Sequence, residues 1–175
     1  MKQFLAAAAV MTSLSAAPAL SIDYNPPFAP IATAGGQTRL IYPQFPVELL
    51  VTEDESGGQF GMAVQYLKPG DGPSDLMLLE NKLTETFYVL EGQFRFEIGD
   101  DRLEGGPGTV VVNPPKVPHG FTNIGTTVGK ILTIYTPADG SRGTSFFTMW
   151  ADQSTRSPEW IAKTNAEYGI DRPAP

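Results

Sequence analysis

The residue types in this chain that are best suited to chemistry are one imidazole and two carboxylates. His119 is the only histidine among the 175 residues, and Glu80 and Glu85 precede it. A carboxylate that faces an imidazole inside a closed cavity forms a general acid/base pair. The two carboxylates and the imidazole together could also hold Fe(II), Mn(II) or Zn(II), because a facial triad needs only three ligands. Both chemistries require a scaffold that brings distant parts of the chain together.

Glycine, proline and asparagine residues around these groups follow a fixed spacing. The positions are Gly72, Glu85 and Gly92, followed by Gly108, Pro114, His119 and Asn123. This spacing resembles the two motifs of the cupin superfamily, which read G-x5-H-x-H-x4-E-x6-G and G-x5-P-x-G-x2-H-x3-N. The segments 85–92 and 166–170 look most like small single-domain cupins of the type-2, quercetin-dioxygenase-like branch. The resemblance covers roughly residues 59–136.

The departures from these motifs fall on positions that carry the metal in the family. The resemblance implies four ligands: two histidines and a glutamate from the first motif, and one histidine from the second. The first-motif histidines would stand at 78 and 80, where this chain has Leu78 and Glu80, and Lys116 replaces the second-motif glycine. The implied metal set is therefore reduced to Glu80, Glu85 and His119. Fewer imidazoles mean a weaker affinity for Fe(II), Mn(II) or Zn(II), so the protein either binds such a metal weakly or works without one.

Short β-prone runs alternate with turns rich in glycine and proline, which predicts an all-β sandwich or barrel. The expected strands are Thr38–Tyr42, Val47–Thr52, Gln59–Leu67, Leu76–Glu80, Thr86–Glu91, Gln93–Ile98, Thr109–Asn113, Val117–Asn123, Gly129–Thr136 and Thr144–Trp150. The resemblance selects a double-stranded β-helix, or jelly-roll barrel, over residues 38–156. Ser157 as an N-cap and Pro158 at the first helical position predict one C-terminal helix within residues 157–175.

The N-terminus predicts export. Lys2 precedes an apolar run, and Ala17-Pro18-Ala19 is a small-residue cleavage site, so residues 1–19 are interpreted as a signal peptide cleaved near Ala19. An N-terminal segment of a cytosolic protein is the other interpretation. Residues 20–37 would then form an extended arm. The sequence has no cysteine, so a secreted chain of this kind would hold its barrel together without disulfides.

Charge and hydrophobicity limit the classes of partner. The chain has 12 basic and 19 acidic residues, a net charge of −7, and no basic cluster. Nucleic acid and anionic membrane surfaces require clustered lysine and arginine, so neither is an expected partner. The N-terminal apolar run is too short to span a bilayer. We expect a small-molecule substrate and a homodimer in which the arm or the first strand covers the partner, because an uncovered sheet edge invites pairing.

Three functions are compatible with these residues. The first is a cupin-type oxidoreductase, dioxygenase-like, that acts in secondary metabolism on a small, largely apolar metabolite of aromatic or polyketide type. The second is a metal-independent isomerase or cyclase in which His119 and Glu85 move protons. The third is a non-catalytic small-molecule-binding cupin, in which His119 is a structural histidine. In each case the expected substrate-lining side chains are Tyr66, Leu78, Phe87 and Phe121, which could equally be core.

Overall fold

The computed structural model of the chain describes residues 39–41, 47–72, 79–80, 82–138, 157–167 and 170–171. The elements are β1 (Arg39–Ile41), β2 (Val47–Val51), β3 (Gly61–Leu67), β4 (Leu79–Glu80), β5 (Thr84–Glu91), β6 (Phe94–Ile98), β7 (Asp101–Gly105), β8 (Val110–Asn113), β9 (His119–Asn123), β10 (Gly129–Thr136), α2 (Pro158–Glu167) and β11 (Ile170–Asp171). The expected signal peptide, the arm and the strand at 144–150 lie outside the described residues.

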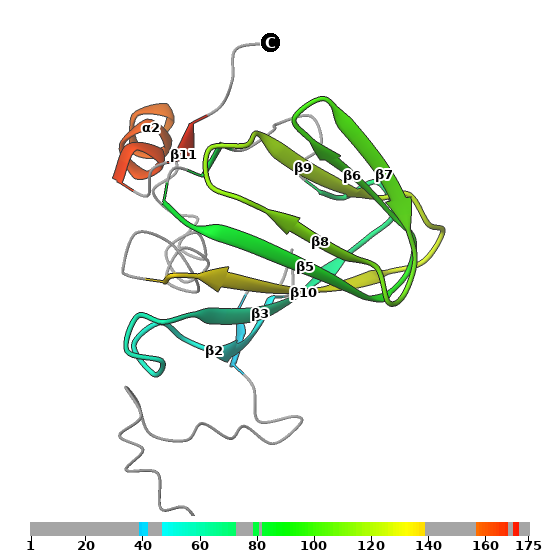
Figure 1. The fold of residues 1–175 in the computed structure, drawn as a ribbon, viewed down its shortest axis with the longest axis horizontal. Coiled ribbons are helices and arrows are strands. Elements are labelled where there is room, and N and C mark those ends of the chain that lie inside the picture. The colour runs from blue at the N-terminus through cyan, green and yellow to red at the C-terminus, as the bar shows by residue number, and fades with distance from the viewer. Residues whose placement is uncertain are drawn as a thin grey trace, which may run out of the picture.

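Two antiparallel sheets form the two layers of the molecule (Figure 1). The larger sheet has the strand order β1-β2-β3-β10-β5-β8, and the smaller has the order β7-β6-β9. Strand β10 lies between β3 and β5, so strands distant in sequence are neighbours in the sheet. This arrangement is the double-stranded β-helix that the resemblance implied, and it confirms the all-β fold class.

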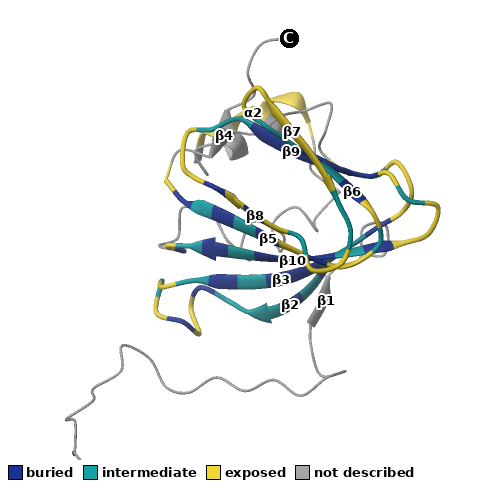
Figure 2. Ribbon diagram, turned by 45° about the vertical axis from the view of Figure 1, so that its right-hand side comes forward, coloured by how far each residue is buried: buried dark blue, intermediate teal, exposed yellow. Residues whose placement is uncertain are grey.

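The space between the sheets is filled mainly by apolar side chains. Strand β10 alternates buried and half-buried residues along its whole length, because one face meets the core and the other does not. Buried residues, coloured dark blue in Figure 2, recur along the strands of both layers. The main core cluster consists of Leu67, Phe87, Val89, Phe94, Phe96, Val111, Phe121 and Ile131. Each such side chain contributes about 1.5–3 kcal/mol when fully buried.

The C-terminal helix begins where the sequence predicted. Ser157 Oγ accepts a hydrogen bond from the Trp160 backbone N–H at 3.1 Å, which is the contact of an N-cap. Beyond α2, strand β11 pairs antiparallel with β4, with Ile170 opposite Glu80. This pairing joins the C-terminal segment to the strand that follows position 78. No helix within the described ranges has the length and hydrophobicity needed to cross a bilayer.

The structure contains one strand, β7, that the sequence analysis did not predict. Its residues, Asp101–Gly105, are exposed along nearly the whole strand, and it pairs with β6 at the outer edge of the smaller sheet. An edge strand with both faces near solvent has no apolar face, so it lacks the alternation that marks a half-buried strand.

Candidate functional site

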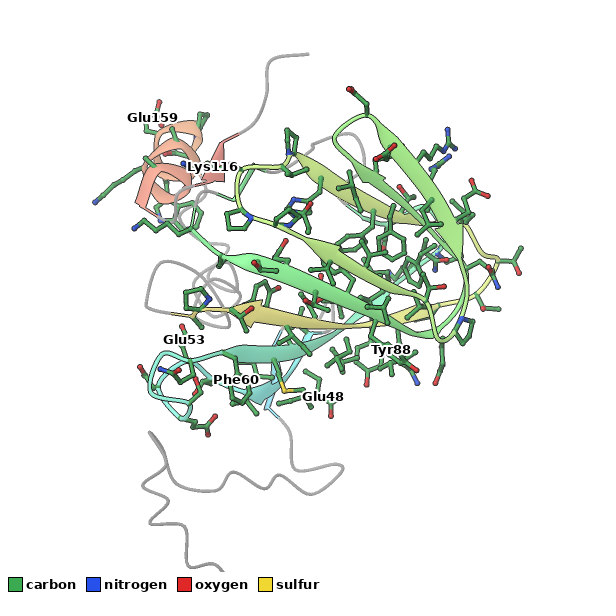
Figure 3. The ribbon with its side chains drawn as sticks, in the orientation of Figure 1. Glu48, Glu53, Phe60, Tyr88, Lys116 and Glu159 are labelled. Carbon is green, nitrogen blue, oxygen red and sulfur yellow. The ribbon has the colours of Figure 1, made fainter. Side chains whose placement is uncertain are left out.

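One end of the space between the sheets is polar instead of apolar. Glu85 of β5 is directly opposite Tyr135 of β10 on one side and Asn113 of β8 on the other. The exposed fractions of these three residues are 4%, 1% and 0%. Figure 3 shows this end of the barrel at the left, where the β8–β9 turn carries Lys116 and the β2–β3 loop carries Glu53. Three buried polar side chains on adjacent strands therefore form one row.

His119 reaches this row from the opposite sheet. It is the first residue of β9, a strand whose five residues are all buried, and it lies opposite Ile98 of β6. Its Nε2 donates a hydrogen bond to Glu85 Oε2 at 2.5 Å. The fold thus brings the imidazole of the second motif into contact with the carboxylate of the first. Their roles as catalytic residues remain predictions.

The second ring nitrogen of His119 is held by the turn between β8 and β9. His119 Nδ1 lies 3.1 Å from the Val117 carbonyl oxygen and 2.7 Å from Asn113 Nδ2. Asn113 Nδ2 also donates to the carbonyl oxygens of Pro114 and Val117, each at 3.3 Å. Because both ring nitrogens have partners, the orientation of the imidazole toward Glu85 is set by the fold.

The environment raises the pKa of two groups in the site. Burial disfavours the charged imidazole, but the hydrogen bond to Glu85, the charge of Glu85 and the contact with the Val117 carbonyl outweigh it, so the pKa of His119 is raised above 6.5. Burial raises the pKa of the Tyr135 phenol well above its ordinary value, and the charge of Glu85 raises it further. Tyr135 is therefore a neutral phenol near Glu85 at neutral pH.

The raised pKa of His119 predicts how stability depends on pH. The folded protein holds this proton more tightly than the unfolded chain, so the stabilisation is complete below about pH 6.5 and is lost as the pH rises through the folded-state value. We expect the difference in unfolding free energy between wild type and His119→Gln to fall as the pH rises above about 6.5. Denaturant unfolding at each pH measures it. A difference that stays flat or grows would contradict the raised pKa.

Phe87 lies against the site on its apolar side, and Phe121 packs against Phe87. The Phe87 ring centroid is 5.9 Å from that of His119 and 5.1 Å from that of Phe121. Both phenylalanines are members of the core cluster, so they form the apolar boundary of the polar end. A ligand in contact with His119 would therefore lie close to an aromatic surface.

Tyr66 is not part of this site, and the expectation that it lines the cavity is wrong. The inner face of β3 carries buried Ala63 and Leu67, so Tyr66, one residue before Leu67, points to the outer face. There its hydroxyl donates to Glu48 Oε2 at 2.8 Å, and the Lys130 ammonium lies 5.5 Å from its ring centroid. The outer face of this strand is nearly as apolar as the inner one, so the sequence did not show which way Tyr66 points.

The described residues do not fit a bound transition metal. Leu78 lies outside them, and Glu80 is described only as part of the β4 backbone. Within the described ranges no group of three His, Cys, Asp or Glu residues could hold a metal ion. Glu85 and His119 offer two ligand atoms, and a third would have to come from Glu80, whose side chain lies outside the described residues.

Motif spacing did not identify two residues of the site. Asn113 stands before Pro114 at an unspecified position of the second motif, and Tyr135 lies near the end of β10. The alternation along β10 could have placed Tyr135 on the inner face. Lys116, exposed in the β8–β9 turn, has φ of 67°, a left-handed conformation that suits the glycine expected there from the resemblance.

Comparison with known protein families agrees with the architecture of this site. The family model of the cupin domain matches residues 63–135. The matched segment includes all four members of the polar end: Glu85, Asn113, His119 and Tyr135. No curated protein matches the chain.

Solved structures share the fold. An RmlC-like cupin from Shewanella frigidimarina NCIMB 400 has a TM-score of 0.52 and 18% identity, covering 63% of this chain and 93% of that one. TT1209 from Thermus thermophilus has a TM-score of 0.50 and 18% identity, covering 61% and 96%. An oxalate decarboxylase has a TM-score of 0.50 and 16% identity, covering 58% and 29%. Such identities show a common fold, and the chemistry has to be argued from the residues of the site.

Proposed function

We propose that this chain, in which residues 63–135 match the family model of the cupin domain, is an enzyme that moves a proton on a small organic substrate. Glu85 and His119 are the acid/base pair. The observation that supports this proposal is the buried hydrogen bond between His119 Nε2 and Glu85 Oε2. A positioned carboxylate and imidazole are able to transfer protons without any further group. The reaction class is isomerisation or cyclisation, with no net oxidation.

The two residues have distinct parts in the proposed reaction. The Glu85 carboxylate takes a proton from a carbon next to a carbonyl group, and the electron pair of the broken C–H bond moves to the carbonyl oxygen. His119 Nε2–H donates a hydrogen bond to that oxygen, in place of its bond to Glu85, as negative charge develops there. Return of the proton to a different carbon gives the isomer. Alternatively, attack of the enolate carbon on a second carbonyl of the same molecule closes a ring, and the proton held by Glu85 passes to the new alkoxide oxygen.

We propose a small, largely apolar substrate of aromatic or polyketide type. The support is the Phe87 ring beside His119, because an aromatic face binds another aromatic ring favourably. The oxidoreductase remains the alternative: it needs a third metal ligand, which Glu80 would supply. The quercetin-dioxygenase-like branch, secretion, secondary metabolism and a homodimer formed through the arm stay predictions.

Deuterium incorporation into candidate substrates tests the proposal. The protein is incubated in D₂O with small aromatic β-diketones and 2-oxo acids, and mass spectrometry follows exchange at the enolisable carbon. We expect exchange that a chelator leaves intact and that Glu85→Gln abolishes. Oxygen consumption that the chelator abolishes would instead establish the oxidoreductase. Ligand-induced changes at His119 without exchange or oxygen consumption would establish a binding protein.

A further inference from the structure

We infer that Asn113 is a positioning residue that holds the neutral His119 ring in the tautomer with its proton on Nε2. The inference deepens the proposed function and rests on it for its catalytic meaning, because this tautomer makes His119 the donor and leaves Glu85 as the acceptor. Asn113 acts through His119: its side-chain nitrogen lies 2.7 Å from the ring nitrogen that faces away from Glu85.

Two backbone carbonyls determine which end of the Asn113 amide faces the imidazole. Asn113 Nδ2 lies 3.3 Å from the carbonyl oxygens of both Pro114 and Val117, and a carbonyl oxygen can only accept. In the reversed orientation, the amide oxygen would face those two oxygens. The observed orientation has a cost, because Asn113 Oδ1 has no hydrogen-bond partner among the described residues. The hydrogen bonds to the Pro114 and Val117 carbonyls therefore outweigh the cost of leaving Asn113 Oδ1 without a donor. They direct the NH₂ group toward His119.

The oriented amide then selects the ring nitrogen that carries the proton. An amide NH₂ donates and does not accept, so at 2.7 Å His119 Nδ1 has to offer its lone pair. A neutral imidazole has a single N–H, which must then be on Nε2. Nε2 is the nitrogen that faces Glu85 Oε2, an acceptor when ionised, at 2.5 Å. Asn113 and Glu85 thus favour the same tautomer from opposite sides of the ring.

The Val117 carbonyl favours the opposite tautomer. It lies 3.1 Å from His119 Nδ1 and would accept a proton from that nitrogen. The Nε2–H tautomer satisfies the two shorter contacts of the ring, whereas the Nδ1–H tautomer satisfies only this longer one. The balance therefore depends on the Asn113 donor, and it shifts toward Nδ1–H when that donor is removed.

The single histidine of the chain allows a direct test. In a ¹⁵N-labelled sample, the two imidazole nitrogens show without ambiguity which one carries the proton, at a pH at which the ring is neutral. We expect Nε2–H in the wild type. Asn113→Leu, similar in size but without a donor, should reduce the ratio of Nε2–H to Nδ1–H by about tenfold, the equivalent of one strong hydrogen bond. Asn113→Asp, which accepts and does not donate, should favour Nδ1–H.

Either of two results would overturn the inference: Nδ1–H as the main tautomer of the wild type, or one unchanged ratio in folded wild type and Asn113→Leu. Circular dichroism and tryptophan fluorescence establish that each variant is folded. The leucine variant decides the question if the buried carboxylate of Asn113→Asp prevents folding. The tautomer is read without substrate, so a failure of the proposed proton transfer leaves this result intact. Conversely, the tautomer ratio could be the same in wild type and Asn113→Leu while Glu85→Gln loses deuterium exchange. That result would overturn the role of Asn113 and leave the proposed function standing.

Discussion

Replacement of Glu85 by glutamine, or of His119 by glutamine, is expected to lower kcat/KM by roughly a hundred- to ten-thousand-fold. Glutamine in place of Glu85 keeps the size of the side chain but removes the base, and glutamine in place of His119 removes the imidazole. The two residues contact one another directly, so they act as a unit. The double variant should therefore be about as active as the worse single variant, not the product of the two losses. Steady-state kinetics on the substrate that shows exchange measures all three.

A matched control for the Glu85→Gln variant lies on the same strand, β5. Glu91 of β5 is exposed and pairs with Lys130 at 2.7 Å on the surface, so Glu91→Gln makes the same chemical change away from the site. A surface ion pair contributes about 1 kcal/mol or less, so this variant should keep its turnover. Retained activity in both Glu85→Gln and His119→Gln would place the chemistry elsewhere in the molecule.

Gly72→Ala is expected to lower the unfolding free energy by roughly 3 kcal/mol or more. The φ of Gly72 is 137°, which L side chains rarely adopt, and a Cβ there would overlap the Phe121 carbonyl oxygen. The segment cannot easily move away, because the Gly70 N–H donates to the Asn123 oxygen at 2.8 Å and the Asn123 N–H donates to the Asp71 oxygen at 2.9 Å. Chemical denaturation measures the loss.

Gly70 separates the two causes of that loss. It also has a positive φ, 82°, but a Cβ at this position would meet no atom within 4 Å. Gly70→Ala should therefore cost only the backbone strain, about 1–2 kcal/mol. Equal losses for the two variants would mean that the contact with Phe121 has no part in the requirement for glycine at position 72.

The resemblance of the motif spacing to the cupin motifs was sufficient to predict the fold and the meeting of Glu85 with His119. The register of paired strands fixes which side chains face one another inside the barrel. A chain that matches the motif positions therefore places the matching side chains together. The prediction for Tyr66 failed because β3 is apolar on both faces and its period of two is hidden. The metal set stays a prediction, since Leu78 and the Glu80 side chain lie outside the described residues.

The two site residues that the motif spacing missed owe their place to turn geometry and to the register between strands. Asn113 belongs to the site because a turn carbonyl and an imidazole both lie within reach of one amide nitrogen. Tyr135 belongs to it because β10 pairs with β5 in a register that puts it opposite Glu85. Both facts follow from strand register and turn geometry, which are properties of the assembled sheet.

The pairing of β4 with β11 has a consequence for the order in which the protein is made. Glu80 lies opposite Ile170, so β4 emerges from the ribosome long before its partner exists. Translation proceeds at roughly 5–20 residues per second, so the barrel strands up to β10 have several seconds in which to pair before β11 appears. The polar end with Glu85 and His119 is encoded entirely within that earlier part. Biosynthesis would therefore assemble the proposed reaction centre first and add the strand beside Glu80 afterwards.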